Sequence, residues 1–133
     1  MVRYFYLDSS VVLRVLLGHS LTAARWLDEI SADESNVLVS SRLLRLEVTR
    51  VLRREGLPVT RRDEVLDFLA LIPLNDGVLT TAETIVPHVK TLDSIHLGSA
   101  IVSGLDLSIV THDSTMKTAA HILGYPVIDP VEE

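Results

Sequence analysis

The chain has 133 residues, a formal net charge of −6 and no cysteine. This length favours one domain over residues 1–133, and the lack of cysteine excludes disulfides, thiolate zinc sites and cysteine nucleophiles. No apolar run approaches the roughly 20 residues that span a bilayer. The first residues also reach a carboxylate too early for a signal peptide, so we expect a cytoplasmic protein.

Apolar runs that end in polar residues alternate with segments that begin at a capping serine or threonine. In chain order, the expected elements are a strand at 3–7, helices at 9–17 and 20–30, a strand at 37–39, helices at 41–54 and from 60, a strand at 72–74, helices at 77–86 and 92–102, a strand at 107–110, a helix at 114–123 closed by Gly124, a strand at 127–128 and a tail at 129–133. Such alternation predicts an α/β fold, with a mainly parallel sheet of four or five strands between two layers of helices.

Four acidic residues border apolar segments instead of lying in solvated charge runs: Asp8, Glu47, Asp93 and Asp113. Asp8 and Asp113 directly follow expected strands, and parallel sheets bind ligands beyond the carboxyl ends of their strands. Carboxylate oxygens suit hard cations such as Mg²⁺ and Mn²⁺. The four residues therefore suggest a metal site for phosphodiester chemistry.

Each acidic residue also has a simpler interpretation. Asp8 and Asp113 could be helix caps, and Asp93 could interact with the dipole of the helix it opens. Glu47 could pair with Arg50 three residues further along its own helix. These alternatives stay open for each residue taken singly, whereas the set of four favours a common site.

Basic residues cluster although the chain as a whole is acidic. Seven of the 12 lysines and arginines fall within residues 42–62, and all seven are arginines. A local basic face can bind phosphates on an acidic protein, although a solvated helix face is the simpler alternative. Arg42 and Arg45 flank Glu47 and are the best candidates for phosphate contacts, with Arg14 a weaker one.

The motifs that carry these residues resemble a known family. They are Tyr-Leu-Asp-Ser-Ser at 6–10, Ser-Ser-Arg-Leu-Leu-Arg-Leu-Glu at 40–47, Leu-Asp-Ser-Ile-His-Leu-Gly-Ser-Ala at 92–100 and Val-Thr-His-Asp at 110–113. Their order and spacing resemble a PIN-domain ribonuclease, specifically the VapC toxin of a type II toxin–antitoxin pair. Two departures are Gly98, where the family often has alanine, and Ser114-Thr115-Met116, which lack a further acidic residue that some members carry.

The resemblance implies a PIN-like three-layer α/β/α sandwich and Mg²⁺- or Mn²⁺-dependent endoribonuclease activity that inhibits translation. By position, Asp8, Glu47, Asp93 and Asp113 match the acidic set of the family, and Ser10 and Thr111 match polar positions beside it. The resemblance also implies an RNA substrate, a homodimer and neutralisation by a cognate VapB-type antitoxin.

Our hypothesis for the roles is that Asp8 and Asp93 bind the cation directly, that Asp113 binds it through water or holds a second ion, and that Glu47 orients or deprotonates the attacking water. His96 shares a helix face with Asp93. It could donate to a carboxylate or to the scissile phosphate, although the simpler interpretation is a packing histidine with one hydrogen bond.

Two surfaces are candidates for partners. Val11, Val12, Val15, Leu16 and the helix around Leu21 and Trp26 could form a groove for an antitoxin helix, or could be ordinary core. The helices within residues 60–86 are the candidate dimer interface.

Two alternative functions come from other classes. The first is a non-catalytic binding module with a PIN-like fold, which the complete acidic set disfavours. The second is a phosphatase or phosphotransferase with Asp8 as an aspartyl nucleophile. Position 10 is serine where such enzymes commonly carry a second acid, while Lys117 keeps this alternative open.

Overall fold

The computed structural model describes residues 1–131. The elements are β1 (Arg3–Leu7), α1 (Ser9–Leu16), α2 (Leu21–Ala32), β2 (Asn36–Ser41), α3 (Arg42–Arg54), the 3₁₀ turn η1 (Val59–Arg62), α4 (Asp63–Leu66), β3 (Ala70–Ile72), α5 (Asp76–Glu83), α6 (Thr91–Ser103), β4 (Leu107–Val110), α7 (Ser114–Ile122) and β5 (Val127–Ile128). Within residues 1–131, no helix is long and apolar enough to cross a membrane.

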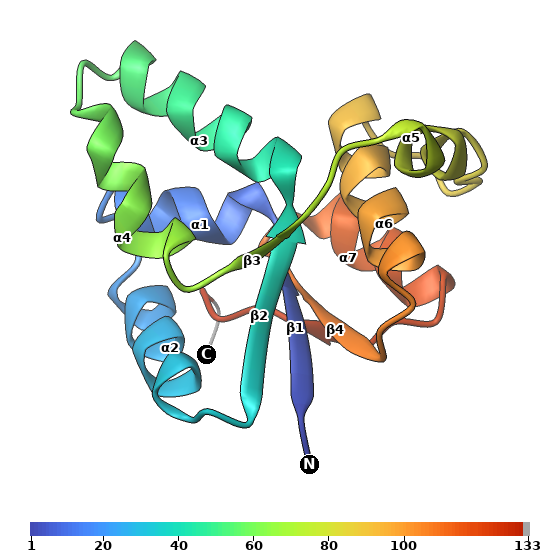
Figure 1. Ribbon diagram of the computed structural model, residues 1–133, viewed down its shortest axis with the longest axis horizontal. Helices are drawn as coiled ribbons and strands as arrows, with labels where there is room; N and C mark the ends of the chain where they lie inside the picture. The colour runs from blue at the N-terminus through green and yellow to red at the C-terminus, as the bar shows by residue number, and fades with distance from the viewer. Residues whose placement is uncertain (132–133) are drawn as a thin grey trace.

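The five strands form one parallel sheet in the order β3-β2-β1-β4-β5. The chain winds from β1 outward to β2 and β3, and then returns to the other side of β1 with β4 and β5. The direction of winding therefore reverses at β1, which makes the carboxyl end of β1 the point where a ligand crevice is expected. Figure 1 shows these strand ends below α3 and α6.

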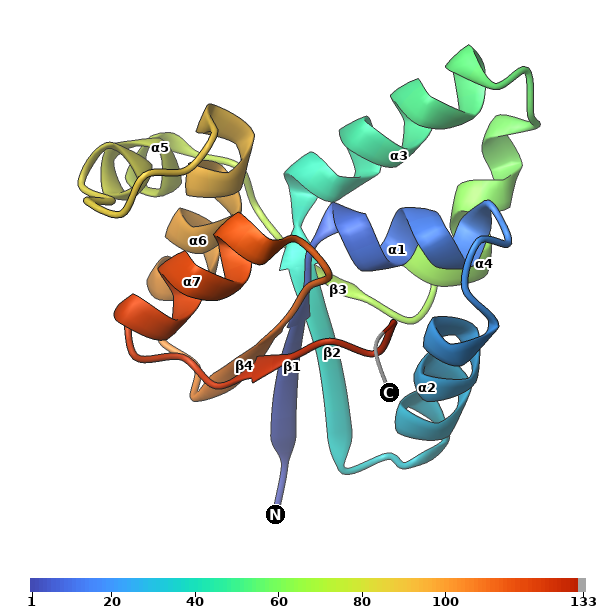
Figure 2. The ribbon, with the colours of Figure 1, turned by 180° about the vertical axis from the view of Figure 1, so that it is seen from behind.

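Two groups of helices cover the two faces of the sheet (Figures 1 and 2). Phe5 and Leu7 of β1 pack in a core with α1, α2, α3 and α4, whereas Tyr6 packs in a second core with α6 and α7. This alternation follows from the period of two in a strand, where neighbouring side chains point to opposite faces. The expected three-layer α/β/α architecture is thus confirmed, with five strands.

Three expected boundaries are wrong. The strand expected at 72–74 is β3 at Ala70–Ile72, because Ala70, Leu71 and Ile72 pair with the end of β2. The helix expected at 77–86 is α5 at Asp76–Glu83, and Thr84 is its C-cap. Thr60 does not cap a helix; it lies inside η1.

The tail was expected to begin at residue 129, but Asp129 is still part of the packed structure. Asp129 Oδ2 lies 2.9 Å from His112 Nδ1 and 2.5 Å from Lys117 Nζ, so this residue is tied to the sheet edge. Residues 132–133 lie outside the described part of the chain.

Of the two interpretations of the apolar residues of α1, a groove or ordinary core, the structure supports the core for three of them. Val11, Val12 and Leu16 are 1%, 0% and 2% exposed and belong to the core, because α2 and α3 pack against α1. Leu21, in contrast, is 65% exposed.

Candidate active site

Asp8 lies directly after β1, at the reversal point of the sheet, and only 3% of it is exposed. Its backbone N–H donates to the carbonyl of Val110 at 3.1 Å, which ties it to the end of β4. Its carboxylate accepts three hydrogen bonds, from Ser10 N at 3.1 Å, Ser10 Oγ at 2.6 Å and Thr111 Oγ1 at 2.6 Å. Burial raises the pKa of Asp8, although the Ser10 and Thr111 hydrogen bonds act in the opposite direction.

Ser10 and Thr111 also connect Asp8 to the loop that carries Asp113. Thr111 Oγ1 accepts a hydrogen bond from Asp113 N at 3.0 Å, and Ser10 Oγ accepts one from His112 N at 3.0 Å. The two hydroxyl groups lie 3.3 Å apart. The structure therefore places both polar residues between the two acidic loops, where the sequence resemblance put them.

Asp8 and Asp113 are also helix caps, as one interpretation of the sequence proposed. Asp8 caps α1 through Ser10 N, and Asp113 Oδ1 accepts from Met116 N at 2.8 Å to cap α7. Capping fixes the direction of each carboxylate at the sheet edge. It is compatible with a second role, because a carboxylate has about four acceptor positions.

Asp93 lies in the first turn of α6 and is partly buried. Burial raises its pKa, and the carboxylates of Asp113, Asp8 and Glu47 raise it further, while His96 acts in the opposite direction. Like charges disfavour ionisation in this way only when they lie close together. The structure thus brings all four expected acidic residues into one electrostatic group at the carboxyl edge of the sheet.

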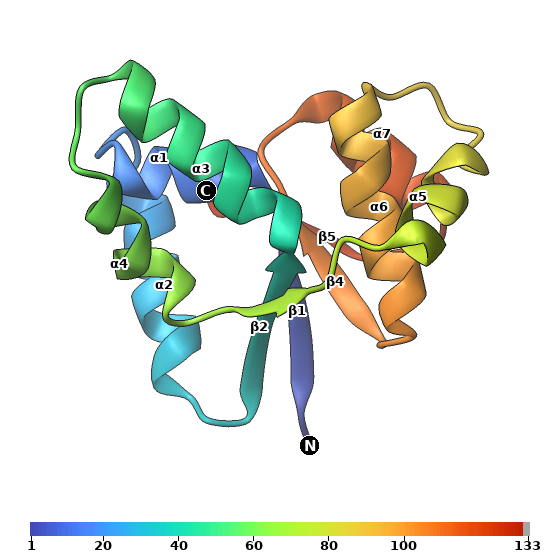
Figure 3. The same ribbon diagram turned by 45° about the horizontal axis from the view of Figure 1, so that its top comes forward.

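Glu47 reaches this edge from the second turn of α3, where its side chain is 16% exposed. Its Oε1 lies 2.6 Å from His96 Nε2, and its Oε2 accepts a hydrogen bond from Ser9 Oγ at 3.3 Å. Within residues 1–131, no ion pair joins Glu47 to an arginine, so the expected pairing with Arg50 does not form. Figure 3 shows α3 and α6, which carry Glu47 and His96, on either side of the strand ends.

The residues fit a hard divalent cation by the chemistry of their donors, which are carboxylate oxygens whose mutual repulsion a cation would relieve. Hydrogen bonds hold Asp8 toward Ser10 and Thr111, and Glu47 toward His96. In this arrangement, no three acidic or imidazole groups of the described chain meet closely enough to enclose an ion.

Ser9 and Tyr6 were not predicted to contribute to the site. For His96, the alternative that it donates to a carboxylate is confirmed, whereas the simpler interpretation gave it one hydrogen bond. It has two partners, Glu47 and Tyr6, whose Oη lies 2.7 Å from His96 Nδ1. The signal available was the spacing of three residues between Asp93 and His96, which places both on one face of α6.

The arginines of the basic cluster at residues 42–62 differ in their surroundings. Arg42 and Arg45 are exposed on the first turn of α3, and no hydrogen bond or ion pair of their side chains occurs among residues 1–131. Arg61, in contrast, donates to the carbonyl of Leu16 at 2.8 Å, and Arg62 donates to Thr49 Oγ1 at 2.8 Å. These two arginines therefore stabilise the fold.

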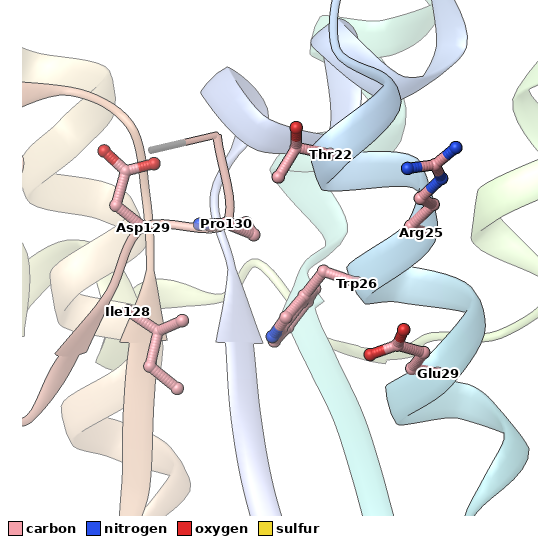
Figure 4. A pocket seen from close by; sticks show the side chains of 7 residues that line it. All are labelled: Thr22, Arg25, Trp26, Glu29, Ile128, Asp129 and Pro130. Atoms are coloured by element: carbon pink, nitrogen blue, oxygen red, sulfur yellow. The ribbon is translucent and has the colours of Figure 1, made fainter. Parts of the chain in front are cut away.

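A separate hollow lies between α2 and the segment after β5 (Figure 4). It is lined by Thr22, Arg25, Trp26, Glu29, Ile128, Asp129 and Pro130. None of the four acidic site residues lines it.

Comparison with known proteins gives three results. The model of the PIN domain matches residues 5–122. Two curated proteins of Mycobacterium tuberculosis align over 94% of this chain and 96% of their own length: "Ribonuclease VapC47" at 31% identity over 131 residues and "Ribonuclease VapC46" at 35% over 130 residues. The crystal structure of VapBC2 from Rickettsia felis, bound to a DNA fragment from its promoter, superposes with a TM-score of 0.73 at 12% identity, covering 94% of this chain and 97% of that chain.

Proposed function

This chain belongs to the PIN-domain family, and we propose that it is a metal-dependent endoribonuclease, the toxin of a type II toxin–antitoxin pair that acts in the cytoplasm by cleaving RNA and inhibiting translation. The observation that carries the proposal is the buried carboxylate of Asp8 at the carboxyl end of β1, which Ser10 and Thr111 hold and connect to the loop of Asp113, with the partly buried Asp93 nearby. Relatives named as VapC ribonucleases, at 31% and 35% identity, support it.

In this proposal, Asp8, Asp93 and Asp113 are the residues that would hold Mg²⁺ or Mn²⁺, and the bound cation would draw their carboxylates closer together than they lie in the structure. When bound, the cation would lower the pKa of the water that it binds and would neutralise charge on the phosphate. Ser10 and Thr111 donate hydrogen bonds that keep both oxygens of Asp8 in place. Thr111 Oγ1 also accepts from Asp113 N, so it fixes the separation between two of the ligands.

Glu47 orients the attacking water and accepts its proton. It suits this role because it is only partly exposed and has a hydrogen-bond donor at each oxygen. Arg42 and Arg45 extend from the same helix into solvent, where they can contact phosphates of the RNA on either side of the cleaved bond.

Two further parts of the proposal concern partners. A homodimer is supported by exposed apolar side chains between residues 60 and 86, namely Phe68, Leu74, Leu79 and Val86. A VapB-type antitoxin segment would find apolar contacts at the exposed Leu21 and at Trp26, which lines the hollow beside α2.

The test is cleavage of total RNA by the purified protein with Mg²⁺ or Mn²⁺, compared with EDTA and with the Asp8→Asn variant purified in the same way. We expect discrete fragments that need the metal, and a rate for Asp8→Asn that is lower by on the order of 100-fold or more, since even indirect partners of a metal site typically contribute 10–100-fold. Asp106→Asn, which alters an exposed acid before β4, is the matched control. Cleavage that survives EDTA, or that is unchanged in Asp8→Asn, would contradict the proposal.

A further inference from the structure

A buried chain of hydrogen bonds runs from the centre of the sheet to the acidic group. Tyr6 Oη lies 2.7 Å from His96 Nδ1, and His96 Nε2 lies 2.6 Å from Glu47 Oε1. Tyr6 and His96 are each 1% exposed, and their rings pack edge to face with centroids 5.8 Å apart. The three residues come from β1, α6 and α3, so the chain of contacts crosses all three layers of the fold.

The partners fix where the imidazole of His96 carries its proton. A carboxylate only accepts hydrogen bonds, so the ring must present N–H at Nε2 toward Glu47. A neutral ring then has no proton on Nδ1, and this nitrogen accepts from the phenol of Tyr6. A phenol ordinarily has a pKa of about 10, so Tyr6 keeps the proton that it donates at neutral pH.

Hydrogen bonds also restrict the orientation of the Glu47 side chain. Ser9 Oγ donates to Oε2 at 3.3 Å, whereas the imidazole contact at Oε1 is 2.6 Å and comes from a buried, rigid group. Glu47 has three side-chain torsions that would otherwise be free at the edge of the crevice. Loss of the imidazole would leave the Ser9 contact alone to hold the carboxylate.

We propose that His96 and Tyr6 are positioning residues: Tyr6 donates to the unprotonated Nδ1 of His96 and holds the imidazole in place, and His96 holds the Glu47 carboxylate in the orientation that RNA hydrolysis needs. This inference rests on the proposed function. A reacting carboxylate must stay within a few tenths of an ångström of its productive position, and hydrogen-bonded neighbours supply that constraint. His96 therefore acts on the reaction through Glu47 and touches no reacting atom itself.

The kinetic test uses the full chain and a fluorescent RNA that contains a cleavage site mapped with total RNA. We expect His96→Leu to lower kcat by about 10- to 100-fold with KM unchanged, because Glu47 moves while the RNA-binding surface stays intact. His96→Gln should recover part of the lost kcat, since its side-chain amide can donate near the position of Nε2. His121→Leu, which removes an exposed histidine of α7, is the control and should match the wild-type protein.

A second measurement needs no RNA. Two-bond ¹H–¹⁵N NMR spectra of the imidazoles should show His96 protonated at Nε2 and unprotonated at Nδ1. Tyr6→Phe should keep this tautomer and shift the Nδ1 resonance, because the phenol that donates to Nδ1 is lost. Tyr6→Phe keeps the packed ring and should lower kcat less than His96→Leu. If thermal melting shows that His96→Leu does not fold, Tyr6→Phe replaces it in the kinetic test.

The outcomes separate the two proposals. A wild-type His96 protonated only at Nδ1, or a folded His96→Leu variant with wild-type kcat, would overturn the positioning role. A wild-type protein that shows the Nε2–H tautomer but cleaves no RNA with Mg²⁺ or Mn²⁺ would confirm the tautomer assignment and overturn the proposed function together with the role of His96 in it.

Discussion

Asp8 accepts hydrogen bonds from Ser10 and Thr111, yet burial still raises its pKa. A carboxyl group whose pKa is higher in the folded than in the unfolded chain stabilises the fold most at low pH. This contribution is lost as the pH rises through the folded-state pKa. Asp93 shifts in the same direction, through burial and its acidic neighbours. At neutral pH both residues therefore lower the stability of the protein, as is common for residues kept for function.

Asp129 has the opposite effect on stability. Burial opposes its ionisation, but hydrogen bonds from Lys117 and His112 outweigh this and lower its pKa from 3.8 to about 2. Ionised Asp129 therefore stabilises the fold above pH 3.8, and the contribution is lost as the pH falls toward 2. We expect Asp129→Asn to lower the free energy of unfolding at neutral pH by about 1–2 kcal/mol.

Urea unfolding at several pH values measures this effect. The difference between the wild-type protein and Asp129→Asn should be largest near pH 7 and should shrink below about pH 4, where the carboxylate of the unfolded chain begins to be protonated. Asp106→Asn, at an exposed site, should change stability by less than about 0.5 kcal/mol. A difference that stays constant between neutral and acidic pH would show that the charge of Asp129 contributes nothing.

Among the helices, α5 and α6 approach each other closely at Gly98. A Cβ at this position would lie 3.0 Å from the carbonyl oxygen of Val78 and 3.1 Å from the backbone nitrogen of Ala82. Both atoms belong to the backbone of α5, which cannot move as a side chain can. This contact gives a physical reason for glycine at this position.

We expect Gly98→Ala to destabilise the protein by about 1–2 kcal/mol, because the overpacking cost of about 1–3 kcal/mol exceeds the gain in helix propensity of about 1 kcal/mol. Val102→Ala on the same helix removes an apolar side chain that is 44% exposed and should have little effect. The measurement is the denaturant midpoint of both variants. A Gly98→Ala variant at least as stable as the wild-type protein would mean that α5 moves away at no cost.

Helix α3 combines Glu47 with the exposed Arg42 and Arg45. If both arginines contact phosphates, their joint replacement by alanine should weaken RNA binding and should reduce the slope of log K against log salt concentration by about 1.4, since each contact to a single strand contributes about 0.7. Binding of a short RNA at several KCl concentrations measures the slope. Arg25→Ala on α2 is the control, and an unchanged slope in the double variant would exclude α3 as the RNA-binding surface.

At the scale of the whole molecule, the reversal of winding at β1 determines where the site lies. Asp8 and Asp113 follow strands on the two sides of this reversal, while Glu47 and Asp93 come from helices on opposite faces of the sheet. The four carboxylates repel one another in a protein that already carries a net charge of −6. A divalent cation at the site should therefore stabilise the folded molecule.

We expect millimolar Mg²⁺ or Mn²⁺ to raise the melting temperature by several degrees, because a cation at 100 times its dissociation constant adds about 2.7 kcal/mol to the free energy of unfolding. KCl at equal ionic strength controls for general screening of the acidic surface. Asp93→Asn should melt at a higher temperature than the wild-type protein without the cation and should respond less to it. An equal response in Asp93→Asn would place the cation elsewhere.

The sequence by itself determined most elements and the positions of the four acidic residues along the chain, because apolar periodicity, capping residues and strand-ending carboxylates are local signals. Local signals did not predict the bounds of β3 correctly. Its position depends on pairing with β2, and the strand lies at Ala70–Ile72 instead of 72–74.

The partners of the site residues were decided only by the tertiary structure. Glu47 meets His96 across 49 positions of the chain, and His96 meets Tyr6 across 90. Asp129, expected in a tail, is fixed by His112 and Lys117. No spacing in the sequence encodes these contacts, because they arise where helices from opposite faces converge on the carboxyl ends of parallel strands. The residue types therefore indicated the chemistry, and the packing of the layers decided which side chains hold one another in place.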